Sequence, residues 1–270
     1  MPRADYGVDA PGVIGGLALG GLAGLAAAIA AALAALTWTA LALLAVGLVL
    51  LAEAALMLCY AWRGKFRHRD RMLALIPWRG DEQVLDVGTG RGLLLVGAAK
   101  RLAAGGRAVG IDIWSRTDLS GNAIERTQAN LEREGVAARC ALKSEPAQAM
   151  NFPDASFDVV LSNLCLHNIK AASERDRACR EIARVLKPGG IAVISDFRHT
   201  RAYSAALRGA GLTATRRGPY VWNVFPPQNI VVARKCHRTS SWRASSAGRG
   251  KTRGGFWGRL APISAASDRR

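Results

Sequence analysis

The feature that most constrains this chain is a run of 43 residues without a charged side chain, from Ala10 to Ala52. The run consists mainly of Ala, Leu, Gly and Val. One helix needs about 20 apolar residues to cross a bilayer core, so the run is long enough for two crossings. A signal peptide has a basic start and one short apolar core, whereas this run is long and follows an acidic leader. We therefore expect a leader of residues 1–12 and a retained transmembrane hairpin of residues 13–62.

A polar break at residues 37–39 divides the hairpin into expected spans of residues 13–36 and 40–62. Five basic residues and one acidic residue follow between Arg63 and Arg71. Basic clusters next to a span stay on the cytoplasmic side of the membrane. The pattern thus predicts a two-span membrane protein with both termini and the following domain in the cytoplasm.

Small residues recur on one face of the first span, where every fourth residue is glycine (Gly12, Gly16, Gly20 and Gly24). Such a face lets another helix backbone approach closely. Two interpretations stay open, namely packing against the second span of the same chain and association between chains.

The basic excess lies outside the hairpin. The whole chain carries +17, and the segment from Arg234 to the end holds ten basic residues and one acidic residue. Ser, Gly and Arg dominate there, so we expect residues 236–270 to form a basic disordered tail. The charge favours membrane orientation over a nucleic-acid partner. The five cysteines have no metal-ligand spacing, so we expect reduced thiols and no metal site.

Between the hairpin and the tail, apolar strand patterns alternate with helical patterns. A basic link and a short helix of residues 63–80 lead into a domain of residues 81–235. Alternation of this kind predicts an α/β fold, a parallel sheet with helices on both faces. Ligands of such sheets lie beyond the carboxyl ends of the strands.

Two of the expected strands end in residues suited to a nucleoside ligand. The first ends as VLDVGTGRG, with Asp86 followed by glycines at positions 88, 90 and 92. A nicotinamide-type GxGxxG turn would need glycine at position 93, which is Leu93. The second strand ends at Asp112, where a carboxylate can accept hydrogen bonds from a ribose diol.

Four ordered segments carry a resemblance: VLDVGTGRG, GIDIW, FPDASFDVVLSNLCLHNI and REIARVLKPGG. Together they resemble the class I S-adenosylmethionine-dependent methyltransferases, closest to the subgroup of ubiquinone/menaquinone C-methyltransferases. The resemblance implies a Rossmann-like sheet of seven strands whose last strand, about residues 230–235, is antiparallel. It also implies S-adenosylmethionine as cofactor and methyl donor.

The resemblance also implies site residues. Where the family usually has Asp or Asn near the adenine amine, this chain has Pro146. The resemblance therefore implies that the adenine contact comes from its neighbours, Glu145 and Ala147. The implied cofactor-binding residues are Asp86, Gly88, Thr89, Gly90, Gly92, Asp112, Ile113, Trp114, Glu145, Ala147 and Asn163.

The implied catalytic residues are His167 and Asn163, in the loop that faces the methyl group. Methyl transfer from a sulfonium depends mainly on positioning, and a base is needed only where the acceptor loses a proton. Histidine suits that role by its near-neutral pKa, although it more often satisfies a local hydrogen bond.

The hairpin and the motifs together predict a membrane-anchored methyltransferase. Its acceptor would be a small molecule, such as a lipid-like compound in the membrane. A cofactor-fold binding module that docks a membrane partner without catalysis is the alternative, favoured by Pro146. We expect the domain to bind cofactor without residues 1–62.

Overall fold

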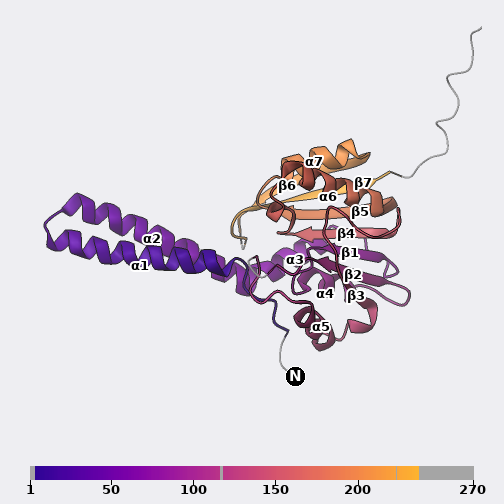
Figure 1. The fold of residues 1–270 in the computed structure, drawn as a ribbon, viewed down its shortest axis with the longest axis horizontal. Helices are drawn as coiled ribbons and strands as arrows, with labels where there is room; N and C mark the ends of the chain where they lie inside the picture. Colours follow the sequence, from indigo (N-terminus) through magenta and orange to yellow (C-terminus); the bar gives the residue numbers. More distant parts are fainter. Residues whose placement is uncertain (1–3, 116–117, 223, 237–270) are drawn as a thin grey trace, which may run out of the picture. The chain divides into compact units, whose positions relative to one another are not determined.

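The computed structural model describes residues 4–115, 118–222 and 224–236. Its centre is a seven-stranded sheet in the order β3-β2-β1-β4-β5-β7-β6 (Figure 1). All neighbouring pairs up to β5 are parallel, whereas β7 is antiparallel to both β5 and β6. The predicted fold class and the antiparallel last strand are confirmed. The strands are β1 (Gln83–Val87), β2 (Arg107–Asp112), β3 (Cys140–Ser144), β4 (Phe157–Asn163), β5 (Leu186–Asp196), β6 (Leu212–Tyr220) and β7 (Gln228–Lys235).

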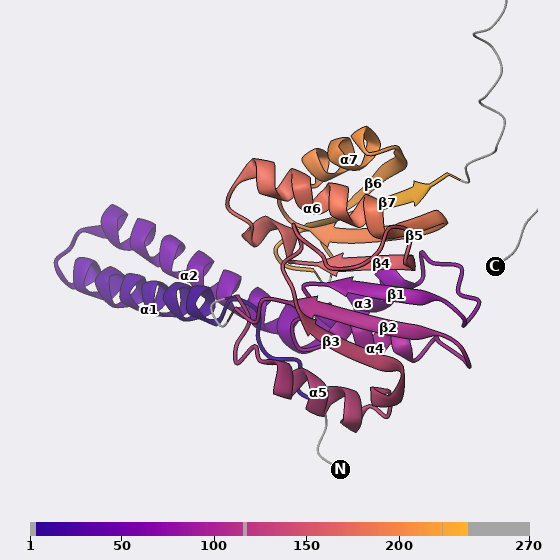
Figure 2. The same cartoon turned by 45° about the vertical axis from the view of Figure 1, so that its right-hand side comes forward.

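Helices cover both faces of the sheet and bury two apolar clusters (Figure 2). One cluster includes residues of α6 and α7, and the other includes residues of α3, α4 and α5. The central strands β1 and β4 are buried on both faces because helices cover each face, whereas the edge strands β3 and β6 are largely exposed. The helices are α3 (Lys65–Leu73), α4 (Leu93–Ala99), α5 (Ile124–Arg133), α6 (Ala172–Val185) and α7 (Thr200–Gly209).

Two apolar helices, α1 (Pro11–Leu33) and α2 (Thr37–Cys59), precede this domain. Each is long and apolar enough to cross a membrane, and only 11% of its most apolar window is buried. The break between them falls at residues 34–36, earlier than predicted, where Ala35 has a φ of 59°. From Cys59 the chain continues without a loop through a π-helical turn, Tyr60–Gly64, into α3.

The glycine face of α1 is used only in part within the hairpin. A Cβ on Gly24 would lie 3.0 Å from the Gly47 Cα of α2, and one on Gly21 would lie 2.6 Å from the Leu51 side chain. Gly12 and Gly16 have open space around them. Packing within the hairpin therefore involves the second half of the predicted face, and association between chains stays a prediction. The predicted tail from residue 237 onward lies outside the described residues.

The leader folds back over the domain as an ordered segment. Its peptide groups bond to α5 and to the loop after β2: the Asp5 amide donates to Asn130 Oδ1, and the Val8 amide donates to Ser120 Oγ. The Ala10 amide donates to the carbonyl of Asp118. Since α1 starts at Pro11, the apolar hairpin begins directly where these contacts end.

Candidate functional site

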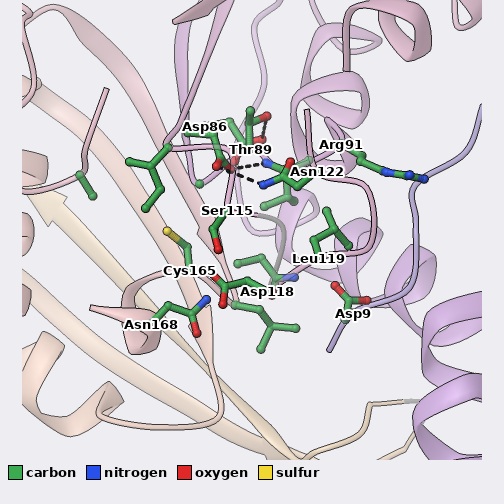
Figure 3. A pocket seen from close by; sticks show the side chains of 18 of the residues that line it. Asp9, Asp86, Thr89, Arg91, Ser115, Asp118, Leu119, Asn122, Cys165 and Asn168 are labelled. Atoms are coloured by element: carbon green, nitrogen blue, oxygen red, sulfur yellow. Dashed lines mark hydrogen bonds between the residues drawn. The ribbon is translucent and has the colours of Figure 1, made fainter. Parts of the chain in front are cut away.

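A cavity of about 510 Å³ lies beyond the carboxyl ends of β1, β2 and β4 (Figure 3). This volume is typical of sites for small molecules and cofactors. The strands meet at this edge because they are parallel neighbours, as the pairing of Asp86 with both Gly110 and Leu161 shows. Nine of the sequence-predicted site residues line the cavity: Asp86, Gly88, Thr89, Gly90, Asp112, Ile113, Glu145, Ala147 and Asn163.

The glycine-rich turn after β1 forms the floor of the cavity. Gly88 has a φ of +71°, and a Cβ added there would lie 2.2 Å from Cys165 Sγ. The turn is held to β2, since the amides of Gly88 and Thr89 both donate to the carbonyl of Ile111. Gly92 begins α4 with a φ of +83° and packs against Thr127, outside the cavity lining. The glycines thus allow a sharp turn and the close approach of the Cys165 and Leu119 side chains to its backbone.

The carboxylate of Asp112 organises the adjoining wall. Its Oδ2 accepts from the Gly90 amide at 2.8 Å, and its Oδ1 accepts from the Trp114 amide at 2.6 Å and from Asn122 Nδ2 at 3.3 Å. Trp114 itself turns away from the cavity lining, and its indole donates to Ser144 Oγ. The position of the Trp114 side chain therefore does not support the predicted contact between Trp114 and the ligand.

Asp86 is buried at the end of β1 and 1% exposed. Thr89 Oγ1 donates to its Oδ2 at 2.8 Å, whereas its Oδ1 is buried and accepts no hydrogen bond from the described residues. Burial raises the pKa of this carboxyl to about 7, an effect that the Thr89 bond opposes and the nearby Asp112 charge reinforces. The site therefore holds a carboxyl group that becomes charged near neutral pH.

Several acceptor atoms around the cavity have no donor. Buried oxygens of Asp9, Asp86, Asn122 and Asn163 accept no hydrogen bond from the described residues, and all four side chains line the cavity. Buried polar groups are almost always paired, so unpaired acceptors fit a ligand that brings donors. S-adenosylmethionine brings an ammonium group, two ribose hydroxyls and an adenine amine. The residues present therefore fit this cofactor.

The leader supplies a wall that the sequence did not predict. Tyr6 and Asp9 line the cavity, together with Lys65 at the start of α3. Lys65 is 4% exposed, and its ammonium group donates to the carbonyls of Tyr6 at 2.9 Å and Gly7 at 2.5 Å. Arg91, after the glycine-rich turn, forms an ion pair with Asp5 at 2.7 Å. Deletion of residues 1–62 would remove Tyr6 and Asp9 from this wall, and cofactor binding without residues 1–62 stays a prediction.

The two predicted catalytic residues lie in different surroundings. Asn163 lines the cavity at the end of β4. His167 lies outside the cavity lining, with its Nδ1 2.9 Å from Asp196 Oδ1 and its ring edge against Phe197. His167 therefore lies beside Asp196 and Phe197, and its catalytic role stays a prediction.

Comparison with known proteins agrees with this geometry. Residues 85–194 match the family model described as methyltransferase domain. The chain carries a class I S-adenosylmethionine-dependent methyltransferase domain. Its cofactor is S-adenosylmethionine, in line with the unpaired acceptors of the cavity.

Two curated relatives of this methyltransferase domain illustrate the range of the family. A 27-O-demethylrifamycin SV methyltransferase of Amycolatopsis mediterranei is 31% identical over 48% of this chain and 44% of its own length. The ubiquinone/menaquinone biosynthesis C-methyltransferase UbiE of Hydrogenovibrio crunogenus is 32% identical over 56% of this chain and 52% of its own length. The chain thus spans about half the length of the curated relatives it matches.

Solved structures show the same fold. The [4+2]-cyclase SpnF superposes with a TM-score of 0.53 at 20% identity, covering 64% of this chain and 81% of that one. YcgJ of Bacillus subtilis superposes with a TM-score of 0.52 at 15% identity, covering 63% and 99%.

Other cavity residues lie outside the predicted set. Ser115, Asp118 and Leu119 belong to the segment after Asp112, for which the sequence leaves a helix-capping loop and a ligand contact both open, and Asn122 follows them. Leu93 and Leu94 of α4, and Cys165 and Asn168 after β4, also line the cavity. Tyr6, Asp9 and Lys65 had no signal in the sequence, because they meet the cavity only through long-range folding of the leader.

Proposed function

We propose that this protein is a membrane-anchored methyltransferase that transfers a methyl group from S-adenosylmethionine to a lipid-like acceptor in or on the membrane. One observation carries the proposal: the leader that lines the cavity runs directly into the apolar helix α1. The cavity and the hairpin therefore share a segment, and an anchored enzyme would meet its acceptor at the bilayer surface.

The proposed topology follows from the same contacts. The leader packs on the domain, and the chain returns to the domain through the π-helical turn after α2. Both ends of the hairpin then lie on one side of the membrane, as two crossings require. The basic residues 63–71 favour the cytoplasmic side.

The residues of the cavity have separate proposed roles. Asp112 and Asn122 would bind the ribose, and Asp86 would attract the positively charged methionine part. The sulfonium of the bound cofactor supplies an electrophilic methyl group with a good leaving group. The protein's own contribution would be to orient the acceptor beside Asn163 and to exclude water with the leader.

The test is label transfer from methyl-labelled S-adenosylmethionine to a membrane lipid extract, using the full-length protein in vesicles. We expect label in the lipid fraction. Asp112→Ala is the matched inactive variant, because it removes three hydrogen bonds at the cavity wall, and it should weaken cofactor binding by about 1–3 kcal/mol. Absence of label in the lipid fraction with the wild-type protein would contradict the proposed function.

A second candidate function is a non-catalytic module that binds the cofactor and docks a membrane partner. The same fold occurs in a protein named as a [4+2]-cyclase, so the fold does not fix the reaction. Pro146 at the adenine side favours this reading. Cofactor binding by calorimetry without label transfer to any membrane fraction would support it.

A further inference from the structure

Asp9 is a cavity residue without an assigned role. It belongs to the leader, two residues before α1, and lines the cavity near Leu119 (Figure 3). Its Oδ2 is buried and accepts no hydrogen bond from the described residues. The nearest cation is Lys65, whose Nζ lies 3.8 Å from this oxygen, too far for a hydrogen bond. Asp9 therefore holds an acceptor atom that a ligand can use.

Asp9 stands at the end of the cavity where the hairpin joins the domain. Tyr60, 4% exposed in the turn after α2, interacts electrostatically with Asp9 and shares a side-chain hydrogen bond with Asn163. Gln228 Nε2 of β7 donates to the same hydroxyl at 3.1 Å. The ribose-side carboxylate, Asp112, lies at the end of β2 instead. This places Asp9 with Asn163, on the side that faces the acceptor.

The surroundings of Asp9 suit proton transfer. Burial raises the pKa of its carboxyl, and the charge of Lys65 opposes this effect. Two of the three hydrogens of the Lys65 ammonium group go to the carbonyls of Tyr6 and Gly7, and its Nζ faces Asp9 Oδ2 at 3.8 Å. A carboxylate with a raised pKa is a stronger base than one with the ordinary value.

Resting on the proposed methyltransferase function, we propose that Asp9 is a catalytic residue that binds a hydroxyl group of the acceptor and takes its proton. The O–H bond of the acceptor breaks and its proton passes to the Asp9 carboxylate. A bond forms between the acceptor oxygen and the methyl carbon while the C–S bond breaks, and the electron pair stays on sulfur as a neutral thioether. Asp9 then releases the proton to solvent.

The chemistry selects the class of acceptor. A carboxylate removes the proton of a phenol or enol far more readily than that of an aliphatic alcohol, because the phenol pKa is about 10. The acceptor is therefore an apolar molecule with an acidic hydroxyl, presented from the membrane side of the cavity.

The experiment compares three full-length variants in vesicles: Asp9→Asn, Asp9→Glu and Asp81→Asn. Asp81 is the matched control, since its exposed carboxylate pairs with Arg79 at 3.0 Å and does not line the cavity. Label transfer from methyl-labelled S-adenosylmethionine to membrane lipid extract is measured as kcat against pH, and cofactor affinity is measured by calorimetry.

We expect Asp9→Asn to lower kcat about 100-fold or more, the usual range for loss of a general base. Cofactor affinity should stay within about threefold, Asp9→Glu should recover part of the rate, and Asp81→Asn should match the wild type. Wild-type turnover in Asp9→Asn, or a loss of rate matched by loss of cofactor affinity, would overturn the proposal. A wild-type protein that transfers no label would instead show that the proposed function fails, and the role of Asp9 with it.

Discussion

The floor and the leader wall of the cavity are built in opposite ways. The floor, Asp86 to Gly92, is a continuous segment at the end of one strand, and its backbone conformation determines its shape. The leader wall, Asp5 to Ala10, has no regular helix or strand and is held by contacts with residues more than 100 positions away, such as Ser120 and Asn130. The floor matches the family model and the leader precedes it. The segment that matches the family model thus rests on local structure, and the leader wall rests on long-range contacts.

The largest expected effect tests the floor. Gly88→Ala should lower cofactor affinity about 100-fold or more, because its Cβ would clash with Cys165 and its φ is positive. Calorimetry with S-adenosylmethionine measures this. Gly105→Ala is the control, since Gly105 has a φ of +95° with open space around it. If both variants lost affinity equally, the loss in Gly88→Ala would come from backbone strain and not from the clash with Cys165.

A smaller effect tests the leader wall. Lys65→Met removes the donors to two leader carbonyls, each worth about 1 kcal/mol, and should weaken cofactor binding by roughly tenfold. It should also expose the leader to limited proteolysis. Lys187→Met is the matched control, because Lys187 pairs with Asp158 at 2.7 Å away from the cavity lining and the leader. Unchanged affinity and protection in Lys65→Met would show that the leader is not part of the cofactor site.

The smallest expected effect is the pH dependence of stability and cofactor affinity that Asp86, in the floor of the cavity, produces. Asp86 has a pKa of about 7 in the folded protein against 3.8 for an ordinary Asp, so the folded state holds its proton more tightly. The stability from this group is present below about pH 4 and is lost as the pH rises to about 7. Affinity for the positively charged cofactor should rise over the upper part of this range, up to about tenfold per pH unit. Asp86→Asn should flatten both trends in melting and calorimetric titrations, and a wild-type affinity independent of pH would contradict this role.

Much of the sheet could be predicted because its central strands are apolar on both faces. The apolar pattern predicts a strand over residues 157–163, and β4 has these bounds. Asp86, Asp112 and Asn163 lie at one edge as the parallel order requires. Strand β6 was not located from the sequence, because it is an edge strand with mostly exposed residues and lacks an apolar pattern. The next strand is predicted from residue 191, whereas β5 begins at Leu186, because Leu186 pairs with Phe157 before a shift in register.

The site was predictable only where it is local. The glycine-rich turn and Asp112 follow from spacing after strands. Three predicted site residues lie outside the cavity lining because each contacts another part of the domain. The Trp114 indole donates to Ser144, His167 lies beside Asp196, and Gly92 packs against Thr127. Neither residue spacing nor hydrophobic periodicity predicted that the leader lines the cavity, because this contact depends on the folded positions of residues far along the chain.

The leader also orders events during biosynthesis. It is synthesised before the domain, yet the Asp5 amide bonds to a residue 125 positions later and the Tyr6 hydroxyl to one 128 positions later. Residues 5–10 therefore lack these partners until α5 and the loop after β2 have been made. The wall of the cavity is thus completed by a segment that is older than the residues that hold it.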